Sequence, residues 1–266
     1  MMSLTGAIVD FKRLEVMAGR TSAVHRLDPR VKVVVTLVFI LTVVSFGRYE
    51  IAALLPFFAF PVAMISIGNL PPLFIAKKIA LLCPFVLMVG FFNPLVDREI
   101  LLHIGPLAIS GGWISLASIL VRSFLTIGAA FILVGITGFA SICQALSRLG
   151  MPQIFTVQLL FLYRYILVLS EEVARSSQAR ELRACGCKGA GIVSFGSLVG
   201  HLLLRTWQRA ENIHLAMLAR GFSGELIVRQ SHRFGLRELL FLSGWSLFFI
   251  TFRIVDMVSL LSGGRP

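Results

Sequence analysis

The sequence predicts an all-α, polytopic helical membrane protein with a cytoplasmic helical region before its last span. Of its 266 residues, 57% are hydrophobic and only 14% are charged, whereas a soluble domain carries about 25% charged residues. Apolar runs long enough to cross a hydrocarbon layer of about 30 Å recur along the chain. The basic segment 138–237 differs from these apolar runs, and we predict that it is the cytoplasmic region.

Five apolar stretches are predicted to cross the membrane as helices. The first follows Asp28-Pro29, because Asp is a good N-cap and Pro is tolerated at the first helical position. Turn residues or polar loops separate the others, among them the loop 93–112. The predicted spans are 31–46, 51–67, 74–92, 113–136 and 239–261.

The distribution of positive charge predicts the orientation, since Lys and Arg gather on the cytoplasmic side. The basic segment 138–237 holds 12 Arg and Lys against 5 Glu, a net charge of +7. If the spans alternate, it lies on the same side as the N-terminus and Lys77-Lys78. We therefore expect a cell-membrane protein with its N-terminus in the cytoplasm. The predicted segments are a cytoplasmic 1–30, four membrane helices in 31–137, cytoplasmic helices in 138–235, and the last membrane helix and tail in 236–266.

The basic segment is predicted to be helical throughout, because no alternating strand pattern occurs in it. An amphipathic helix that begins at Phe139 is stopped by Gly150-Met151-Pro152. The next helix begins at 153 and continues to Cys185, and its half 153–170 is apolar enough to enter the membrane without crossing it. The run 192–204 is interpreted as too broken to span, and a final helix is predicted over 203–219.

Two helices of the basic segment are predicted to end on similar tripeptides, Leu182-Arg183-Ala184 and Ala219-Arg220-Gly221. Arg in a last turn interacts favourably with the helix dipole, and a following Gly supplies the left-handed cap. That structural interpretation accounts for each end alone. The alternative is docking: the stripe before Arg220, formed by Arg209, Ile213, Ala216 and Met217, suits a groove, and the guanidinium suits a partner's carboxylate. Spacing alone leaves both open.

The opening Val24-His25-Arg26-Leu27-Asp28-Pro29-Arg30-Val31-Lys32, together with the two Arg motifs 37 residues apart, resembles the CbiQ family. The resemblance covers about residues 20 to 260. CbiQ proteins are the transmembrane T components of energy-coupling factor (ECF) transporters for cobalt or nickel. A single Ala-Arg-Gly tripeptide is a weak signal, but the opening, the paired motifs and the topology together are fairly specific.

The resemblance implies a scaffold that couples two cytoplasmic ABC-type ATPases, similar to CbiO, to a membrane substrate-binding component similar to CbiM. A small accessory subunit similar to CbiN can accompany them. In this family the paired X-Arg-X motifs end two crossing coupling helices and dock on the ATPases. Carried over, the docking residues are Leu182, Arg183, Ala184, Ala219, Arg220 and Gly221. The first motif departs from the commoner Ala-Arg-Gly form, which puts the strength of its docking in doubt.

Several other activities find no support in the sequence. No Gly-x-x-x-x-Gly-Lys-[Ser/Thr] loop occurs, so the chain is not expected to hydrolyse ATP itself. The five histidines are dispersed and Cys185 and Cys187 lack a second pair, so neither a metal site nor a bound cofactor is expected. The net charge of +12 is interpreted as favouring contact with the membrane lipid surface. Binding to nucleic acid is not expected, because no aromatic-basic module accompanies the charge.

Charges inside predicted spans are costly and require an explanation. Arg122 lies within the fourth span, and Arg253 and Asp256 lie at i and i+3 in the last one, where they can neutralise each other. A structural role is favoured over a transport pathway. The alternative function is a self-sufficient secondary transporter or membrane-embedded enzyme, which predicts inverted repeats or a polar catalytic cluster in the spans; neither is found.

Overall fold

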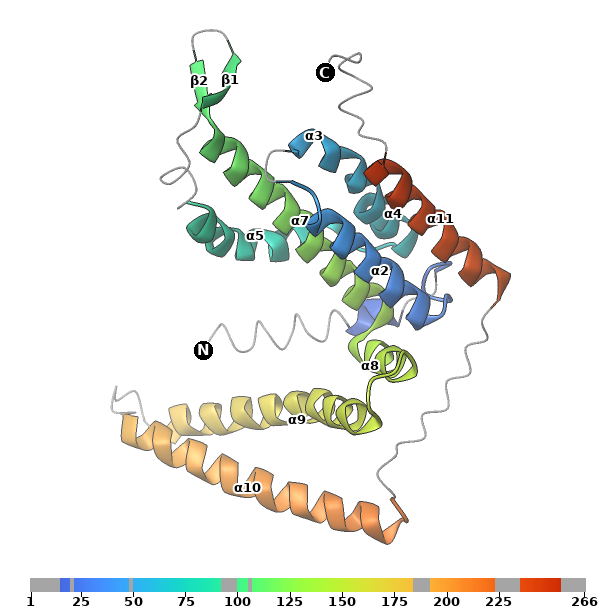
Figure 1. The fold of residues 1–266 in the computed structure, drawn as a ribbon. Coiled ribbons are helices and arrows are strands. Elements are labelled where there is room, and N and C mark those ends of the chain that lie inside the picture. The colour runs from blue at the N-terminus through green and yellow to red at the C-terminus, as the bar shows by residue number, and fades with distance from the viewer. Residues whose placement is uncertain are drawn as a thin grey trace. The chain divides into compact units, whose positions relative to one another are not determined.

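The computed structural model describes residues 15–19, 22–47, 50–91, 100–104, 107–183, 192–222 and 235–254. These residues fold almost entirely into helices (Figure 1), which confirms the prediction of an all-α membrane protein. The elements are α2 (Pro29–Val44), α3 (Ile51–Leu54), the 3-10 helix η1 (Leu55–Phe58), α4 (Ala59–Gly68), α5 (Pro72–Gly90), β1 (Ile100–Ile104), β2 (Leu107–Ser110), α7 (Gly111–Thr137), α8 (Phe139–Arg148), α9 (Gln153–Arg183), α10 (Ile192–Ala219) and α11 (Leu236–Ile254).

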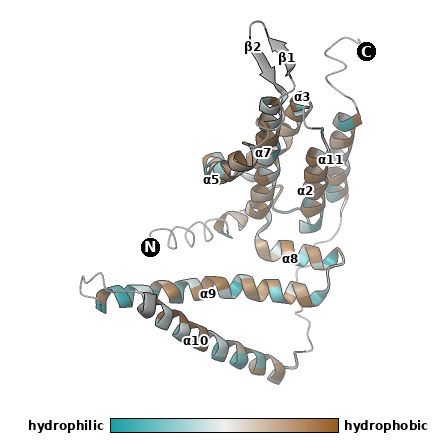
Figure 2. Ribbon diagram, turned by 60° about the vertical axis from the view of Figure 1, so that its left-hand side comes forward, coloured by the Kyte–Doolittle hydropathy of each residue, from teal (hydrophilic) through white to brown (hydrophobic). Residues whose placement is uncertain are grey.

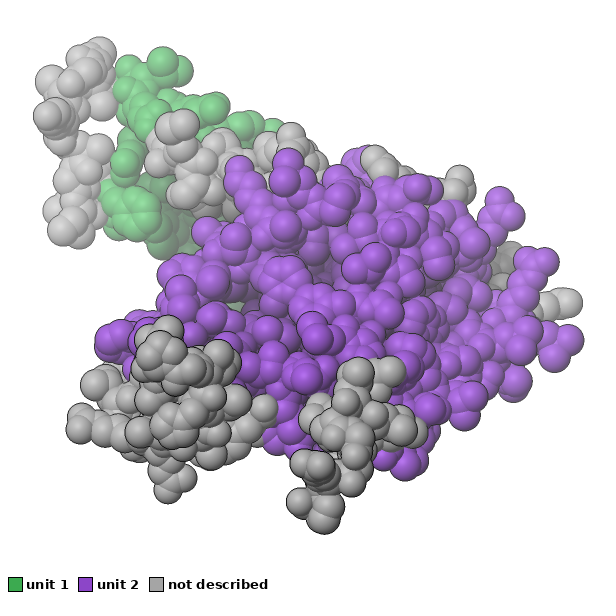
Figure 3. Space-filling view, turned by 90° about the horizontal axis from the view of Figure 1, so that it is seen from above, with its two compact units in different colours: residues 1–15, 139–230 green, residues 16–138, 231–266 purple. Residues whose placement is uncertain are grey.

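The chain divides into two compact units (Figure 3), which are described separately. Unit 1 consists of residues 1–15 and 139–230 and contains α8, α9 and α10. Unit 2 consists of residues 16–138 and 231–266 and contains α2 to α7 and α11. Hydrophobic residues dominate most of α2, α5, α7 and α11, whereas α9 and α10 carry more polar positions (Figure 2).

Helix α2 of unit 2 starts where the sequence predicts. The Asp28 carboxylate accepts a hydrogen bond from the backbone N–H of Arg30 at 2.9 Å, and Pro29 takes the first helical position. Asp28 is only 2% exposed, so this cap is part of the packed structure. Satisfying an otherwise unpaired N–H of the first turn fixes the start of α2.

The second predicted span, 51–67, is helical over residues 51–68 but is not a single regular helix. The 3-10 helix η1 interrupts it between α3 and α4, with Pro56 near its start. Pro lacks the N–H that an α-helical bond at this point requires, which explains the local change. The run ends at Asn69, whose φ of 48° is left-handed, as in a common helix C-terminal cap.

Three described helical runs are long and apolar enough to cross a membrane: Ile51–Gly68, Gly111–Thr137 and Gln153–Arg183. The first two match predicted spans, and the third includes the segment predicted to enter the membrane without crossing it. Predicted spans 31–46, 74–92 and 239–261 correspond to α2, α5 and α11, which contain 16, 19 and 19 residues. Residues 255–261 lie outside the described residues. The number of spans therefore stays a prediction.

The predicted polar loop 93–112 is wrong for part of its length. Strands β1 and β2 pair antiparallel, with Ile104 opposite Leu107 and an irregularity between Ile100 and Leu102. In the sequence, two short apolar runs flank Gly105-Pro106, which is a turn signal. The charged residues before these runs favoured a polar loop as the prediction. Two short apolar runs around a turn are also the pattern of a short hairpin.

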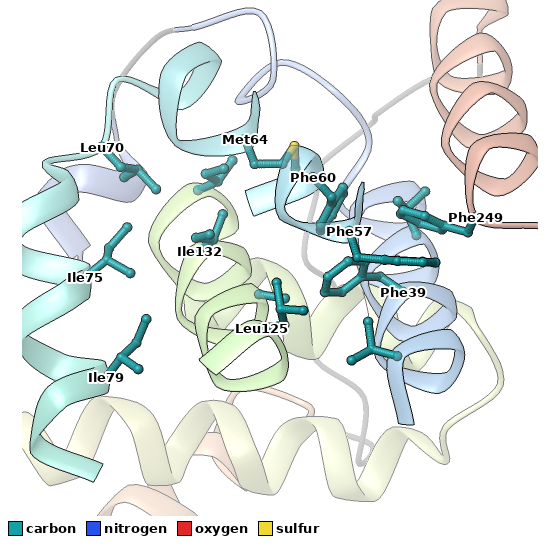
Figure 4. Close-up of a cluster of buried hydrophobic side chains, with 14 of the residues drawn as sticks. Phe39, Phe57, Phe60, Met64, Leu70, Ile75, Ile79, Leu125, Ile132 and Phe249 are labelled. Carbon is teal, nitrogen blue, oxygen red and sulfur yellow. The ribbon is translucent and has the colours of Figure 1, made fainter. Parts of the chain in front are cut away.

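The core of unit 2 combines aliphatic residues of α5 and α7 with an aromatic cluster between α2, η1, α4 and α11 (Figure 4). Phe39 is fully buried, with ring centroids 4.7 Å from Phe60 and 5.4 Å from Phe249. Trp245 meets the Phe60 ring edge-on at 4.9 Å. Such tilted and edge-to-face pairs add about 0.5–1.5 kcal/mol each beyond area burial. They bring α11, which is distant in sequence, against α2.

Unit 1 corrects one sequence-based interpretation. The run 192–204 and the helix 203–219 are not separate, because α10 is continuous over 28 residues through Gly196 and Gly200. Apart from the backbone of α10 itself, no atom of the described residues lies within 4 Å of a Cβ added at either glycine, so neither marks a close contact. The predicted helix from 153 is confirmed as α9, described to Arg183. Helix α8 and its stop at Gly150, whose φ is +112°, are also confirmed.

Candidate functional site

Helices α9 and α10 form an antiparallel pair that carries both Arg motifs. The two helices run in opposite directions and diverge from their contact (Figure 1). Arg183 is the last residue of α9, and Arg220 directly follows the last residue of α10. Opposite directions place the two C-terminal ends, and with them the two arginines, at opposite ends of the pair.

One stripe of α10 faces α9. Its members are half-buried and recur every three or four residues, as one face of a helix requires: Leu198, Leu202, Thr206, Arg209, Ile213 and Met217. A groove of about 390 Å³ lies between the helices and is lined by apolar side chains that include Tyr165, Trp207 and Met217. The apolar stripe predicted to suit a partner's groove therefore lies largely against α9, whereas Ala216 is exposed.

A carboxylate joins the two helices where they meet. Glu172 of α9 accepts hydrogen bonds from Arg205 at 2.8 Å and from Arg209 at 3.0 Å. The side chain of Glu172 is 8% exposed, whereas those of Arg205 and Arg209 are 68% and 39% exposed. The hydrogen bond from Arg205 lowers the pKa of the Glu172 carboxyl below its usual 4.5, with the charge of Arg209 acting in the same direction.

Arg220 stands at an exposed helix end of defined geometry. The N–H of Gly221 donates to the carbonyl of Leu218, and the N–H of Phe222 donates to that of Met217, both at 3.0 Å. This pair of bonds is a Schellman motif, which requires a left-handed residue after the cap. Gly221 supplies it with a φ of +78°. The Gly cap predicted from the sequence is therefore present, and it leaves the Arg220 side chain on the surface.

Arg183 occupies the corresponding position on α9. It lies in the last described turn together with Arg180, and its side chain is exposed. Leu182 beside it is 81% exposed. Ala184, the third residue of the predicted motif, and Cys185 and Cys187 lie outside the described residues. A basic last turn complements the negative end of the α9 dipole, so local stability alone accounts for charge at this place.

The two arginines lie beyond the interhelical clamp, the ion pairs of Glu172 with Arg205 and Arg209. Arg183 follows Glu172 by eleven positions on α9, and Arg220 follows Arg205 and Arg209 by fifteen and eleven positions on α10. With a rise of about 1.5 Å per residue, the clamp lies about 16 Å from Arg183 along α9 and about 16 to 22 Å from Arg220 along α10. The helix pair therefore has a guanidinium at each end, with the clamp between them.

The two arginines predicted inside spans bind the same segment of unit 2. Arg122 on α7 donates to the carbonyl of Gly47, and to the Ser118 hydroxyl at 3.2 Å. Arg253 on α11 donates to the carbonyl of Ser45 at 3.1 Å. Both therefore satisfy carbonyls that follow the C-terminus of α2, where the helix dipole is negative.

This arrangement agrees with the structural role favoured for these charges, which no independent observation tests. The Arg253 guanidinium also lies over the Phe46 ring, 4.5 Å from its centroid. The predicted Arg253–Asp256 pair cannot be placed, because Asp256 lies outside the described residues. Sequence reasoning missed the contacts to residues 45–47, since two arginines 131 positions apart in the chain give no local signal of a shared partner.

Glu172 is the functional candidate that sequence reasoning missed. Its partners lie 33 and 37 residues further along the chain, beyond any helical periodicity. The available signal was compositional: acidic residues are scarce in the basic segment, so each has an excess of possible cationic partners. Among the described residues no group of three or more His, Cys, Asp or Glu could hold a metal ion.

Comparison with known proteins adds evidence from outside the structure. The model of the CbiQ family, described as cobalt transport protein, matches residues 20–233. An uncharacterized protein of Methanocaldococcus jannaschii is 29% identical over 39% of this chain and 39% of its own. A putative ABC transporter ATP-binding protein of Bifidobacterium longum is 26% identical over 83% of this chain and 30% of its own.

A third relative matches along most of its length. The energy-coupling factor transporter transmembrane protein EcfT of Leuconostoc gelidum subsp. gasicomitatum is 28% identical over 82% of this chain and 87% of its own. The chain thus spans less than half the length of the first two relatives and nearly all of the third.

Proposed function

The chain belongs to the CbiQ family of cobalt transport proteins, and from this premise we propose that it is the transmembrane scaffold subunit of an ECF transporter. In this role it couples ATP hydrolysis by separate ATPase subunits to the uptake of a divalent metal ion, cobalt. The family is that of a membrane component of a transporter, which agrees with the expectation that the chain is not itself an enzyme.

One observation carries the coupling proposal: two long helices end on exposed arginines, and a common clamp joins the helices between these ends. Helices of 31 and 28 residues are stiff enough to transmit a displacement from their ends. Each guanidinium can make a bidentate, charge-assisted bond to a carboxylate at the edge of an ATPase groove. Two separated tips fit two ATPase subunits, one at Arg183 and one at Arg220.

The coupling follows from the lever geometry. When the two ATPases close on ATP, they change the separation of the Arg183 and Arg220 tips. Because Glu172 holds α9 to α10 between those tips, the displacement appears as a change of angle between the helices. The chain leads from α9 through α8 to α7, so rotation of α9 reaches the membrane helices and the metal-binding membrane partner.

The names of two relatives support ATPase partners. EcfT is named as the transmembrane protein of an energy-coupling factor transporter, and its match covers nearly its full length. The relative from Bifidobacterium longum is named an ATP-binding protein, yet most of this chain matches only 30% of it. We take this as support for a scaffold of this type working with an ATP-binding part. A CbiM-like substrate binder and a CbiN-like subunit complete the proposed assembly.

The location and orientation follow from charge. We propose that unit 1 and the N-terminus face the cytoplasm, because the basic segment 138–237 has a net charge of +7 and ATP is cytoplasmic.

We propose cobalt rather than nickel as the transported metal, and this choice rests on the family description alone. In proteoliposomes that contain the complete transporter, ATP should drive accumulation of radioactive cobalt; accumulation of nickel alone would contradict the assignment of the metal and leave the scaffold role intact.

The docking role is tested by reversing charge at the two tips. With affinity-tagged ATPase subunits, Arg183→Glu and Arg220→Glu should each reduce the amount of this chain that co-purifies at least tenfold. A tenfold loss corresponds to about 1.4 kcal/mol, which lies within the loss of about 2 kcal/mol or more expected when a buried interface arginine is replaced. The double variant should not co-purify, while its amount in the membrane stays unchanged.

Arg175→Glu is the matched control, because Arg175 is an exposed arginine on the same helix, away from its end. This variant should assemble as the unaltered chain does. Co-purification of the double variant at the normal level would reject docking through these arginines. Metal uptake by the purified chain alone in liposomes would reject the scaffold role and support a self-sufficient carrier.

A further inference from the structure

A small polar pocket lies in unit 1 where α8 ends and α9 begins. Its volume is about 190 Å³, and its polar lining consists of Gln144, Ser147, Arg148, Gln153 and Thr156. The first three lie on one face of α8, at positions i, i+3 and i+4, and the last two lie in the first turn of α9. None of the described residues that line it is acidic. The pocket therefore has one positive charge, at Arg148, and hydroxyl and amide groups that can donate hydrogen bonds.

The start of α9 has none of the residue types that usually cap a helix. The residue before it is Pro152, whose side chain has no acceptor, and its first turn contains no acidic residue. The N–H of Phe155 donates to the Pro152 carbonyl at 3.1 Å. The other N–H groups of the first turn have no partner within an α-helix. A helix of 31 residues thus presents the positive end of its dipole at this pocket.

Thr156 provides independent evidence that a ligand belongs here. The residue is only 7% exposed, and its hydroxyl Oγ1 is buried with no hydrogen-bond partner among the described residues. Other hydroxyls in this unit bond to their own helix: Ser170 donates to the Leu167 carbonyl at 2.7 Å and Thr206 to the Leu203 carbonyl at 2.8 Å. A buried hydroxyl without a partner is costly, and none of the described residues supplies one for Thr156, so the hydroxyl is available to a ligand in this pocket.

We propose that this pocket binds a phosphate group. Phosphate brings several acceptor oxygens and negative charge, which match a helix N-terminus, the Thr156 hydroxyl and the Arg148 guanidinium together. Only Gly138 separates α8 from the end of α7, a helix long enough to cross the membrane. A membrane position for α7 puts α8 near the lipid headgroups. The phosphate can come from an anionic lipid headgroup or from solution.

The two sources are separated by titrating the full-length chain in neutral detergent. Three probes are compared by native mass spectrometry and by thermal shift: dioctanoyl phosphatidylglycerol, dioctanoylglycerol, which lacks the phosphate, and inorganic phosphate. The site predicts binding of the phospholipid and none of dioctanoylglycerol. Phospholipid binding at least 100-fold tighter than inorganic phosphate assigns the lipid as the source. Equal or tighter binding of inorganic phosphate assigns the soluble ion.

Substitutions locate the site. Thr156→Val and Arg148→Gln should each weaken binding of the preferred phosphate probe about tenfold, as expected for the loss of one charge-assisted bond. Thr206→Val and Arg175→Gln, the same changes elsewhere in unit 1, should leave binding unchanged. Thr156→Val keeps the side-chain shape, so without ligand its melting temperature should not fall. Unchanged phosphate binding by Thr156→Val, or equal binding of phospholipid and dioctanoylglycerol, would overturn the proposal.

Discussion

Glu172 links α9 to α10, because it is the buried partner of two exposed arginines. Its pKa is lowered below the usual 4.5 in the folded chain, mainly by the hydrogen bond from Arg205. A carboxyl whose pKa falls on folding adds stability above its unfolded pKa and loses it as pH drops through the folded value. The clamp therefore holds throughout the neutral range and opens only in acid, below pH 4.5.

Neutralising this carboxylate should loosen the helix pair. With nitroxide labels at the exposed positions Leu182 and Leu218, Glu172→Gln should broaden the distribution of distances between the labels at pH 7. Since Arg205 reaches solvent, the loss should be only about 0.5–1 kcal/mol. The difference from the unaltered chain should shrink as pH falls well below 4.5.

Glu181→Gln on the same helix is the control, because Glu181 is exposed and does not contact α10 in the clamp. It should keep the narrow distribution. If Glu172→Gln gave the same distances as the control at pH 7, the ion pairs would not hold the crossing, and apolar packing along the groove would have to account for it instead.

At the scale of a single element, the end of α10 depends on one glycine. Gly221 has a φ of +78°, which costs a residue with a Cβ about 1–2 kcal/mol. Gly221→Ala should therefore distort the cap that presents Arg220 and weaken binding to the ATPase subunits severalfold. A titration of tagged ATPases against the full chain in detergent measures this affinity.

The matched control is Gly196→Ala in the body of the same helix. Apart from the helix's own backbone, none of the described residues lies within 4 Å of an added Cβ there, and the helix is regular, so alanine should stabilise α10 slightly. Its ATPase affinity should be unchanged. If both glycine variants bound equally well, the geometry of the cap would be irrelevant to docking, whatever the role of the arginine itself.

Local signals predicted the elements well. Asp28-Pro29 identified the start of α2, and Gly150 and Gly221 identified two helix ends, because caps depend on neighbouring residues only. Two errors have a physical cause. Gly196 suggested a break in α10, although one glycine costs a helix only about 1 kcal/mol. The strands 100–104 and 107–110 are too short to stand out beside charged residues.

The site could be predicted only in part. Arg183 and Arg220 were identified by a motif, and the structure shows both exposed at helix ends. The clamp at Glu172 joins residues more than thirty positions apart, and the Arg122 and Arg253 contacts join still more distant ones. Periodicity carries no information at such separations, so these contacts required the fold.

On the scale of the whole molecule, the proposed mechanism gives the two units different roles. Unit 2 has a core that a membrane helix bundle needs, with Phe39, Phe57 and Phe60 fully buried and large hydrophobics exposed on its outer faces. Unit 1 contains α8 and the long helices α9 and α10, whose C-terminal ends carry Arg183 and Arg220. Gly138, with a φ of +75°, lies between α7 of unit 2 and α8 of unit 1. The proposed coupling requires two such parts, one that stays in lipid and one that receives force from soluble partners.

The claim that the charged helix ends are where ATPases bind is tested most directly by photo-crosslinking. A benzoylphenylalanine replaces Leu182, Leu218 or Ile154 in the assembled transporter; all three are exposed, at 81%, 51% and 76%, and Ile154 lies at the opposite end of α9. We predict adducts with the ATPase subunits from Leu182 and Leu218 and none from Ile154. Adducts from Ile154 alone, or from none of the three while the complex stays assembled, would contradict the proposed levers.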